Sequence, residues 1–347
     1  MIEIIDREKS NDIYKDLREW VKQIDYFSLA RNPSPKIVPI MIHFIFYKLC
    51  NLNKNEIMRF FLDLSENPNV SSIMSECKNS RKYLYWCYIS KNPKALPIIE
   101  EIFIENDLFN KNSIYNTLWY YSTNYYYKIN WYCLSKNPNA IHLLEKNLKK
   151  IDWDGLSMNQ RAVGILEKNL DKVNWKHLSG NPRAVHILER NLDKVDWSML
   201  SGNPNAIHIL ENNLDKVDWE KLCSNKNAIH ILEKNLDNLD EGCWSTLSEN
   251  PNALYILENN LDKIKWLELS FNTKANILIE KNYHKKKESV FWCCLSRNQN
   301  AVPLLEKNLD KVDWCELSKN PKAIHILEKN LDKVNWSSLS ENPAIFL

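Results

Sequence analysis

A tryptophan recurs along most of the chain, and its spacing constrains the fold more than any other feature. From Trp131 to Trp219 one occurs every 22 residues, and five more follow as far as Trp336 at intervals of 25, 22, 26, 22 and 22. The residues between them repeat as well, since 175–196 reads WKHLSGNPRAVHILERNLDKVD and 197–218 reads WSMLSGNPNAIHILENNLDKVD. A period of this length is typical of proteins built from stacked repeats.

Each repeat carries two signals for the start of a helix. Asp196 can accept hydrogen bonds from the free amides of a short first helix that begins at Trp197. Asn203-Pro204 is the second signal, because proline at the first helical position removes an amide that has no partner there. We expect the second helix to run from near Pro204 to Asn213, where a left-handed Asn would end it. The sequence therefore predicts an all-α fold, an α-solenoid of two-helix units of about 22 residues.

A unit of this size cannot bury its own apolar side chains, so neighbouring units must cover them. We expect Trp197 to be the largest side chain in this shared core and Asn203 to act as a helix cap. On this view Trp197→Ala destabilises the protein more than Asn203→Ala does. The expected core positions of this repeat are Trp197, Leu200, Ala206, Ile207, Ile209, Leu210, Leu214 and Val217.

The regularity of the pattern divides the chain into two parts. Residues 131–347 hold the regular repeats, of which the last ends at ENPAIFL and is incomplete, and residues 1–130 hold an N-terminal cap and diverged repeats. The diverged repeats are expected at 26–33, 61–68 and 86–93, a degenerate one at 118–127, and a capping helix at 1–20.

Composition narrows the surroundings in which the chain works. The 46 basic and 44 acidic residues leave a net charge of +2, too small to steer the chain onto phosphate or a membrane. The nine cysteines are odd in number and show no CxxC spacing, which is typical of reduced intracellular thiols. The apolar stretch 37–49 is too short for a membrane span and predicts a buried helix. The N-terminus lacks the pattern of a signal peptide, so we expect a cytoplasmic protein.

The repeat also resembles a known one. LSGNPNAIHILENNLDKVDW at 200–219, and its counterpart at 317–336, closely resemble a repeat found in proteins of large DNA viruses of amoebae to which no function is assigned. The resemblance covers about two thirds of the chain. It implies helical repeats in the cytoplasm of an infected host cell, and it carries over no catalytic residues. The step from Leu200 to Pro204 also looks like the mitochondrial transcription terminator repeats, which bind nucleic acid but have a longer unit and a basic groove.

The motifs of common enzymes and metal sites do not occur. The sequence has no GxSxG, HExxH or zinc-finger spacing, and five glycines leave little for a phosphate-binding loop. We therefore expect no enzyme, no cofactor and no metal. Histidines do recur at one repeat position, but equivalent residues of adjacent repeats should lie about 8–10 Å apart. That spacing is too wide for two of them to share a zinc ion. The recurring glutamates, such as Glu211, are expected to be solvated or hydrogen-bonded between repeats, and the lysines at 285–287 to form an exposed loop.

Polar residues of the second helix follow one side of it. Asn205, His208, Glu211 and Asn212 are spaced so that they lie away from the apolar positions, and stacking would align such stripes into a ridge. Their mixed charge suits a protein surface, and we expect a non-enzymatic scaffold for protein–protein interaction. The candidate ridge comprises Asn139, His142, Arg183, His186, Arg190, Asn205, His208, Asn212, Asn227, His230, Lys234 and His325.

Two alternatives remain open. The array could bind nucleic acid, with the variable pairs of the first helices, such as Lys176-His177 and Glu220-Lys221, as base readers. The repeat 197–218 opposes this because it carries one lysine against three acidic residues, so no basic stripe follows the array. The other alternative is that the ridge is simply solvated and binds nothing.

Overall fold

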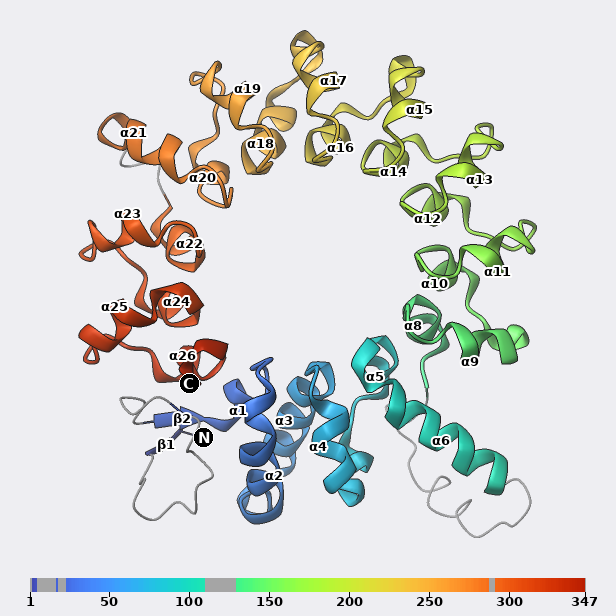
Figure 1. Ribbon diagram of the computed structural model, residues 1–347, viewed down its shortest axis with the longest axis vertical. Helices are drawn as coiled ribbons and strands as arrows, with labels where there is room; N and C mark the ends of the chain where they lie inside the picture. Colours follow the sequence, from blue (N-terminus) through green and yellow to red (C-terminus); the bar gives the residue numbers. More distant parts are fainter. Residues whose placement is uncertain (1, 5–16, 18–22, 110–128, 287–290, 347) are drawn as a thin grey trace. The chain divides into compact units, whose positions relative to one another are not determined.

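The computed structural model describes residues 2–4, 17, 23–109, 129–286 and 291–346 (Figure 1). They form two compact units, unit 1 with Met1–Leu156 and Val334–Leu347, and unit 2 with Ser157–Lys333. The expected all-α fold is confirmed, because the described part of the chain is helices and turns apart from two short strands. The expected division at 130/131 rests on the regularity of the sequence and stays a prediction.

Each regular repeat except the incomplete last one contains a short first helix and a second helix, as the sequence predicts. In unit 2 the first helices form one row and the second helices another (Figure 1). The first helices are α8 (Trp131–Lys136), α10 (Trp153–Ser157), α12 (Trp175–Ser179), α14 (Trp197–Ser201), α16 (Trp219–Ser224), α18 (Glu241–Glu249), α20 (Trp266–Leu269), α22 (Trp292–Arg297), α24 (Trp314–Lys319) and α26 (Trp336–Ser340). The second helices are α9 (Ile141–Lys146), α11 (Val163–Glu167), α13 (Val185–Glu189), α15 (Ile207–Glu211), α17 (Ile229–Glu233), α19 (Leu254–Glu258), α21 (Asn276–Lys286), α23 (Val302–Glu306) and α25 (Ile324–Lys329).

The N-terminal part of unit 1 is also helical. Its elements are β1 (Ile2–Ile4), β2 (Gln23–Asp25), α1 (Tyr26–Leu29), α2 (Val38–Tyr47), α3 (Lys54–Glu66), α4 (Val70–Glu76), α5 (Trp86–Lys91) and α6 (Leu96–Phe109). The expected capping helix at 1–20 is wrong at its start, because β1 pairs antiparallel with β2. The rest of that segment, except Leu17, and the degenerate repeat at 118–127 lie outside the described residues.

Helix α2 contains the most apolar stretch of the chain. Its side chains Ile40, Met41 and Phe44 are buried as expected, but Phe46 and Tyr47 at its end are 58% and 67% exposed, so the helix is buried on one side only. Among the described helices, none combines the length and the apolar character that crossing a bilayer requires.

Short 3-10 helices connect several of these elements. Three of them begin at the proline of an Asn-Pro pair, namely η4 (Pro93–Ala95), η10 (Pro321–Ala323) and η11 (Pro343–Ile345). The others are η1 (Pro35–Ile37), η2 (Leu49–Asn51), η3 (Lys78–Tyr83), η6 (Leu148–Lys150), η7 (Leu214–Lys216) and η8 (Leu236–Asn238).

The ends of the helices follow the predicted capping only in part. Asp196 accepts a hydrogen bond from the Met199 amide at 2.9 Å, which confirms the start of the first helix at Trp197. The second helix starts at Ile207 and not at Pro204. The residues before it form a turn, because the Asn205 amide donates to Oδ1 of Asn203 at 3.0 Å.

The second helix ends at Glu211, two residues before Asn213, and Asn213 does not adopt the expected conformation. Its φ of −142° is not left-handed, so the backbone does not fold back there. Instead its side-chain amide donates to the carbonyl of Ile209 at 2.8 Å and satisfies an acceptor that the helix end leaves free. Leu214, expected in the core, is 36% exposed as a result.

Asn203 links its repeat to the one before it. Its Nδ2 donates to the carbonyls of Ser179 at 2.9 Å and Asn181 at 3.2 Å, and the side chain is 1% exposed. Its Oδ1 accepts from the Asn205 amide, as expected of a cap, so the inter-repeat contact is a second role of the same side chain. The same position donates to the preceding repeat at Asn67, Asn92, Asn137, Asn181, Asn225, Asn250, Asn272, Asn298 and Asn320. We call this series the Asn ladder.

A serine two residues earlier makes a second link, toward the following repeat. The Ser201 hydroxyl donates to the Trp197 carbonyl at 2.7 Å and accepts from the Asp218 amide at 3.0 Å. Ser201 is fully buried, so both of its bonds form away from water. Equivalent serines accept from the next repeat at Ser65, Ser90, Ser135, Ser157, Ser179, Ser248, Ser270 and Ser296.

The tryptophans are less buried than expected. Trp244 and Trp266 are 6% and 7% exposed, but Trp197 is only half-buried. It begins a one-turn helix at the rim of the repeat, and Nζ of Lys216 lies 4.9 Å from its ring centroid. A lysine over the ring face is a cation–π contact. The core itself consists of smaller side chains such as Leu200 and Leu210, both fully buried.

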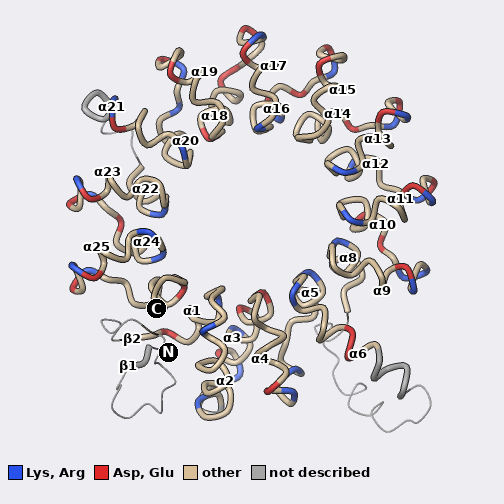
Figure 2. The backbone as a smooth tube through the Cα atoms, viewed as in Figure 1, with Lys and Arg blue, Asp and Glu red and all other residues tan. Residues whose placement is uncertain are grey.

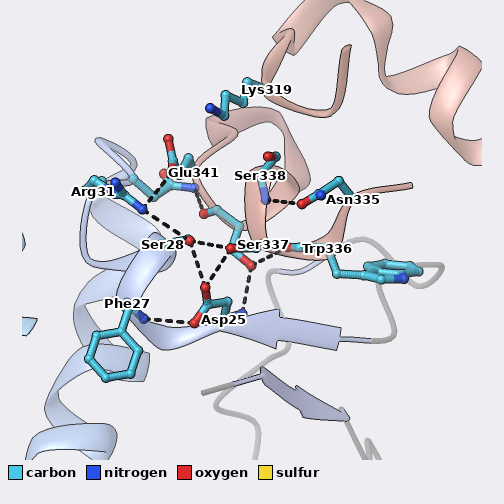
Figure 3. A network of polar contacts seen from close by, with 12 residues as sticks. Asp25, Phe27, Ser28, Arg31, Lys319, Asn335, Trp336, Ser337, Ser338 and Glu341 are labelled. Carbon is cyan, nitrogen blue, oxygen red and sulfur yellow. Dashed lines mark hydrogen bonds and ion pairs between the residues drawn. The ribbon is translucent and has the colours of Figure 1, made fainter. Parts of the chain in front are cut away.

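The last repeat of unit 1 packs against the first one. In Figure 3, Asp25 and Ser28 meet Ser337 between α1 and α26. The Ser337 hydroxyl donates to Asp25 at 2.7 Å, and the Asp25 amide donates to the Ser340 hydroxyl at 2.8 Å. The second bond is equivalent to the bond from the Asp218 amide to the Ser201 hydroxyl, which joins two consecutive repeats. We call this contact the seam.

The Asn ladder continues across the seam. Asn32 donates to the carbonyls of Ser340 at 2.9 Å and Asn342 at 3.0 Å. Asn203 donates to the carbonyls at the same two positions of the repeat that precedes it. Within unit 1, the C-terminal repeat therefore takes the place of the repeat that would precede the first. Two ends that would otherwise expose apolar surface and backbone groups cover each other.

The buried carboxylate at the seam makes its stability depend on pH. Burial raises the pKa of Asp25, hydrogen bonds from the Ser337 and Ser28 hydroxyls lower it, and the pKa lies below its usual value. A lowered pKa stabilises the fold above the unfolded pKa of about 4, and this is lost as the pH falls through the folded value. We expect Asp25→Asn to lower the free energy of unfolding in urea more at pH 6 than at pH 3. An equal loss at both pH values would contradict the ionised seam.

Candidate functional site

The predicted ridge is exposed, but only its histidines lie within the second helices, and its other members lie in the turns that flank them. Arg183, His186, Arg190 and their counterparts lie at the surface, and only Asn139 of the twelve candidates is half-buried. The reason is the helix phase, because the adjacent positions Ile187 and Leu188 point into the core. The geometry expected from the sequence is thus present, while binding by these residues stays a prediction.

The ridge of unit 2 carries mixed charge. Lysines and arginines alternate with acidic residues along α11, α13, α15 and α17 and the turns that follow them (Figure 2). Such a surface has no continuous field of one sign, so it favours partners with polar and charged groups of both signs over a polyanion.

Histidines on the ridge contact glutamates of the neighbouring repeat. His230 Nε2 lies 2.7 Å from Oε1 of Glu211, and both side chains are about half exposed, at 48% and 47%. The same contact pairs His142 with Glu100, His186 with Glu167, His208 with Glu189 and His325 with Glu306. The expectation of glutamates hydrogen-bonded between repeats is confirmed at these positions. Exposed pairs of this kind contribute about 0–1 kcal/mol each.

The asparagines of the ridge are tied to the preceding repeat too. Asn205 Nδ2 donates to the Pro182 carbonyl at 2.8 Å, and Asn227 donates to the Pro204 carbonyl at 2.9 Å. Asn139 makes the equivalent bond in unit 1. These side chains are therefore held in one orientation at the surface, which lowers the entropic cost of a further contact.

The remaining candidates contribute longer or differently held groups. Arg183, Arg190 and Lys234 place cationic ends at the exposed surface of the turns that flank α13 and α17. Asn212 donates to the carbonyl of His208 at 2.8 Å, at the end of α15. Guanidinium groups bind carboxylates with two parallel hydrogen bonds, so the arginines are the strongest donors of the set.

The histidine series is interrupted in the last part of unit 2. Tyr255 and Ile277 stand at the histidine position in two consecutive repeats, and each side chain is 65% exposed. Pro303 replaces the histidine in the next repeat and is also exposed. Exposed side chains without charge therefore stand beside ion pairs on this part of the surface, where Lys307 contacts Glu280 of the preceding repeat at 2.5 Å. Different parts of the surface present different chemistry.

Two further expectations concern metals and the lysine run. Among the described residues, no three His, Cys, Asp or Glu side chains come close enough to hold a metal ion together. The expected loop at 285–287 is wrong in its first two residues, because α21 continues through Lys286. Residue 287 lies outside the described part of the chain.

Sequence reasoning missed the buried polar contacts between repeats. The signal was present, since the asparagine occurs in every repeat and the serine in all but two, where Ala30 and Cys223 replace it, although neither is an apolar core residue. It also missed a pair of cysteines, Cys87 and Cys133, that lie in neighbouring repeats but are far apart in the chain.

Comparisons with protein-family models, curated proteins and solved structures found no match to this chain.

Proposed function

We propose that the chain is a non-enzymatic scaffold that binds a protein partner through the ridge of its second helices. The observation that supports this is a surface of constant geometry and variable chemistry. The position that is Arg183 in one repeat is Asn205 and then Asn227 in the next two, and each is exposed at the same place in its repeat. A surface built in this way can present a different side chain at each step.

The ladders between repeats supply the rigidity that such a surface needs. The Asn ladder and the serine links join consecutive first helices and the turns that follow them through buried hydrogen bonds, and each second helix continues from such a turn. A partner therefore meets side chains that are already positioned, and less conformational freedom is lost on binding. Arg183 and Arg190 favour acidic groups on that partner, because the guanidinium fork matches a carboxylate.

The proposal includes the setting that the sequence suggests. The resemblance of 200–219 to repeats of large DNA viruses of amoebae supports a viral protein that acts in the host-cell cytoplasm. No cofactor is part of the proposal, and nucleic acid is the alternative ligand that the experiment must separate from a protein.

The decisive experiment compares two faces of the same repeats. We expect the triple variant Arg183→Ala, Arg190→Ala and Lys234→Ala to lose a partner that the native full-length chain captures from the infected or source cell. A loss of about tenfold or more in affinity is typical when central charged contacts are removed. The partner would be identified by mass spectrometry and its affinity measured by titration calorimetry.

The matched control changes three exposed or half-exposed residues of the first helices, Lys176→Ala, Ser198→Ala and Lys221→Ala. This variant should keep the partner. Loss of the partner in the control but not in the ridge variant would contradict the proposal. Tight binding of an oligonucleotide with affinity that falls steeply with salt would favour the nucleic-acid alternative instead.

A further inference from the structure

Two cysteines of neighbouring repeats lie in contact in unit 1. Cys87 is the second residue of α5 and Cys133 the third residue of α8, and their Sγ atoms are 3.2 Å apart. The two residues are 46 apart in the chain, so the packing of the repeats brings them together. A disulfide needs an S–S distance of about 2.05 Å, so a small side-chain movement would suffice.

The two thiols differ in access to solvent. Cys87 is exposed, whereas Cys133 is 8% exposed. Burial, together with the hydrogen bond and charge of the Cys87 thiol, raises the pKa of Cys133 to about 12. A reagent in solution therefore meets Cys87 first, and Cys133 lies behind it as the second thiol.

We propose that Cys87 and Cys133 form a site of oxidative modification that reacts with a peroxide and becomes a disulfide between α5 and α8. The Cys87 thiolate attacks one oxygen of hydrogen peroxide, the O–O bond breaks, and the other oxygen leaves as hydroxide, which takes up the proton that Cys87 lost. Cys87 becomes a sulfenic acid. Cys133 loses its proton and attacks the Cys87 sulfur. The sulfenic oxygen leaves as water and the disulfide forms. In sum, two thiols are oxidised and one peroxide is reduced to two waters.

Another pair of thiols in unit 2 provides an internal comparison. Cys223 and Cys243 interact with each other across consecutive repeats, but they are 0% and 2% exposed. A peroxide in solution does not reach them while the protein is folded. Cys315 is exposed and reports whether the reagent oxidises any accessible thiol.

In the test, the whole chain is treated with a small excess of hydrogen peroxide. It is then denatured in the presence of a reagent that alkylates the remaining free thiols. Peptides would be mapped by mass spectrometry without reduction. We expect a pair of disulfide-linked peptides, one with Cys87 and the other with Cys133. Two of the nine cysteines should therefore escape alkylation. Cys223 and Cys243 should be alkylated as free thiols. The link should raise the unfolding temperature by about 5 °C, because it restricts the unfolded chain.

Single variants separate the steps. Cys133→Ser should stop at a sulfenic acid on Cys87 that a dimedone probe labels, and Cys87→Ser should leave Cys133 unmodified. Cys315→Ser should form the link as the native protein does. The proposal is overturned if Cys87 of the native protein ends as a sulfinic or sulfonic acid without the link, or if it pairs with a different cysteine.

Discussion

Asn203→Ala should lower the free energy of unfolding by about 3 kcal/mol, because each buried polar group left without a partner costs about 1–3 kcal/mol. The amide of Asn203 donates to two carbonyls of the preceding repeat, and its oxygen accepts from the Asn205 amide. Alanine removes all three bonds in a place that water does not reach, since the side chain is 1% exposed.

Trp197→Ala should cost less than this, which reverses the order expected from the sequence. The ring is only half-buried, so part of its surface is in contact with water in the folded protein as well. The cation–π contact with Lys216 forms at the exposed rim, where such contacts contribute about 0.5–1 kcal/mol. We expect a total loss of about 2 kcal/mol, consistent with partial burial of one aromatic side chain.

Urea unfolding followed by circular dichroism would measure both changes. Asn205→Ala is the matched control, because it removes one exposed hydrogen bond from the same turn and should cost under about 1 kcal/mol. Asn203→Asp should be at least as harmful as alanine, because its carboxylate would face the two carbonyls. A larger loss for Trp197→Ala than for Asn203→Ala would show that the Asn ladder contributes little.

The repeat architecture was predictable because its signals are local. The spacing of the tryptophans set the period, and Asp196 with Trp197 marked a helix start that needs no information from elsewhere in the chain. The exposed stripe of the second helices followed from the helical period alone, which is why His208 and Asn212 lie at the surface as expected.

The role of Asn203 could not be predicted in the same way. An Asn before Pro has the same local signature whether its amide faces solvent or the carbonyl of a neighbouring repeat. Choosing between them requires the register of two repeats, which is a property of the packing. Asn213 shows the same limit, since a left-handed backbone at Asn and a side-chain bond to Ile209 both satisfy the free carbonyls of a helix end.

The seam was equally beyond the sequence pattern. A repeat describes its relation to its neighbours along the chain, and it contains no information about which repeat meets the first one. The residues of the seam follow the consensus, since Asp25 and Asn32 stand at the repeat positions of Asp196 and Asn203. The pattern therefore identifies them as contacts between repeats without identifying the repeat that they meet. Only the packing of the folded chain pairs Asp25 and Asn32 with residues more than 300 positions away.

Asn32→Ala should therefore destabilise unit 1 by about 3 kcal/mol, as Asn203→Ala does in unit 2, because it leaves the same two carbonyls without a donor. Asn32 is fully buried, so water cannot replace the lost bonds. Arg31→Ala is the matched control. Arg31 also crosses the seam, to Glu341 at 2.9 Å, but its side chain is 43% exposed. A pair this exposed should contribute under about 1 kcal/mol.

Hydrogen exchange would locate the effect as well as measure it. The amide of Asp25 donates to the Ser340 hydroxyl, so Ser340→Ala should speed exchange at residue 25 although the two lie 315 positions apart in the chain. Asn32→Ala should do the same if the seam opens as one cooperative contact. If Asn32→Ala cost no more than Arg31→Ala, and the amide of residue 25 exchanged at an unprotected rate in the native protein, the first and last repeats would not be docked in solution.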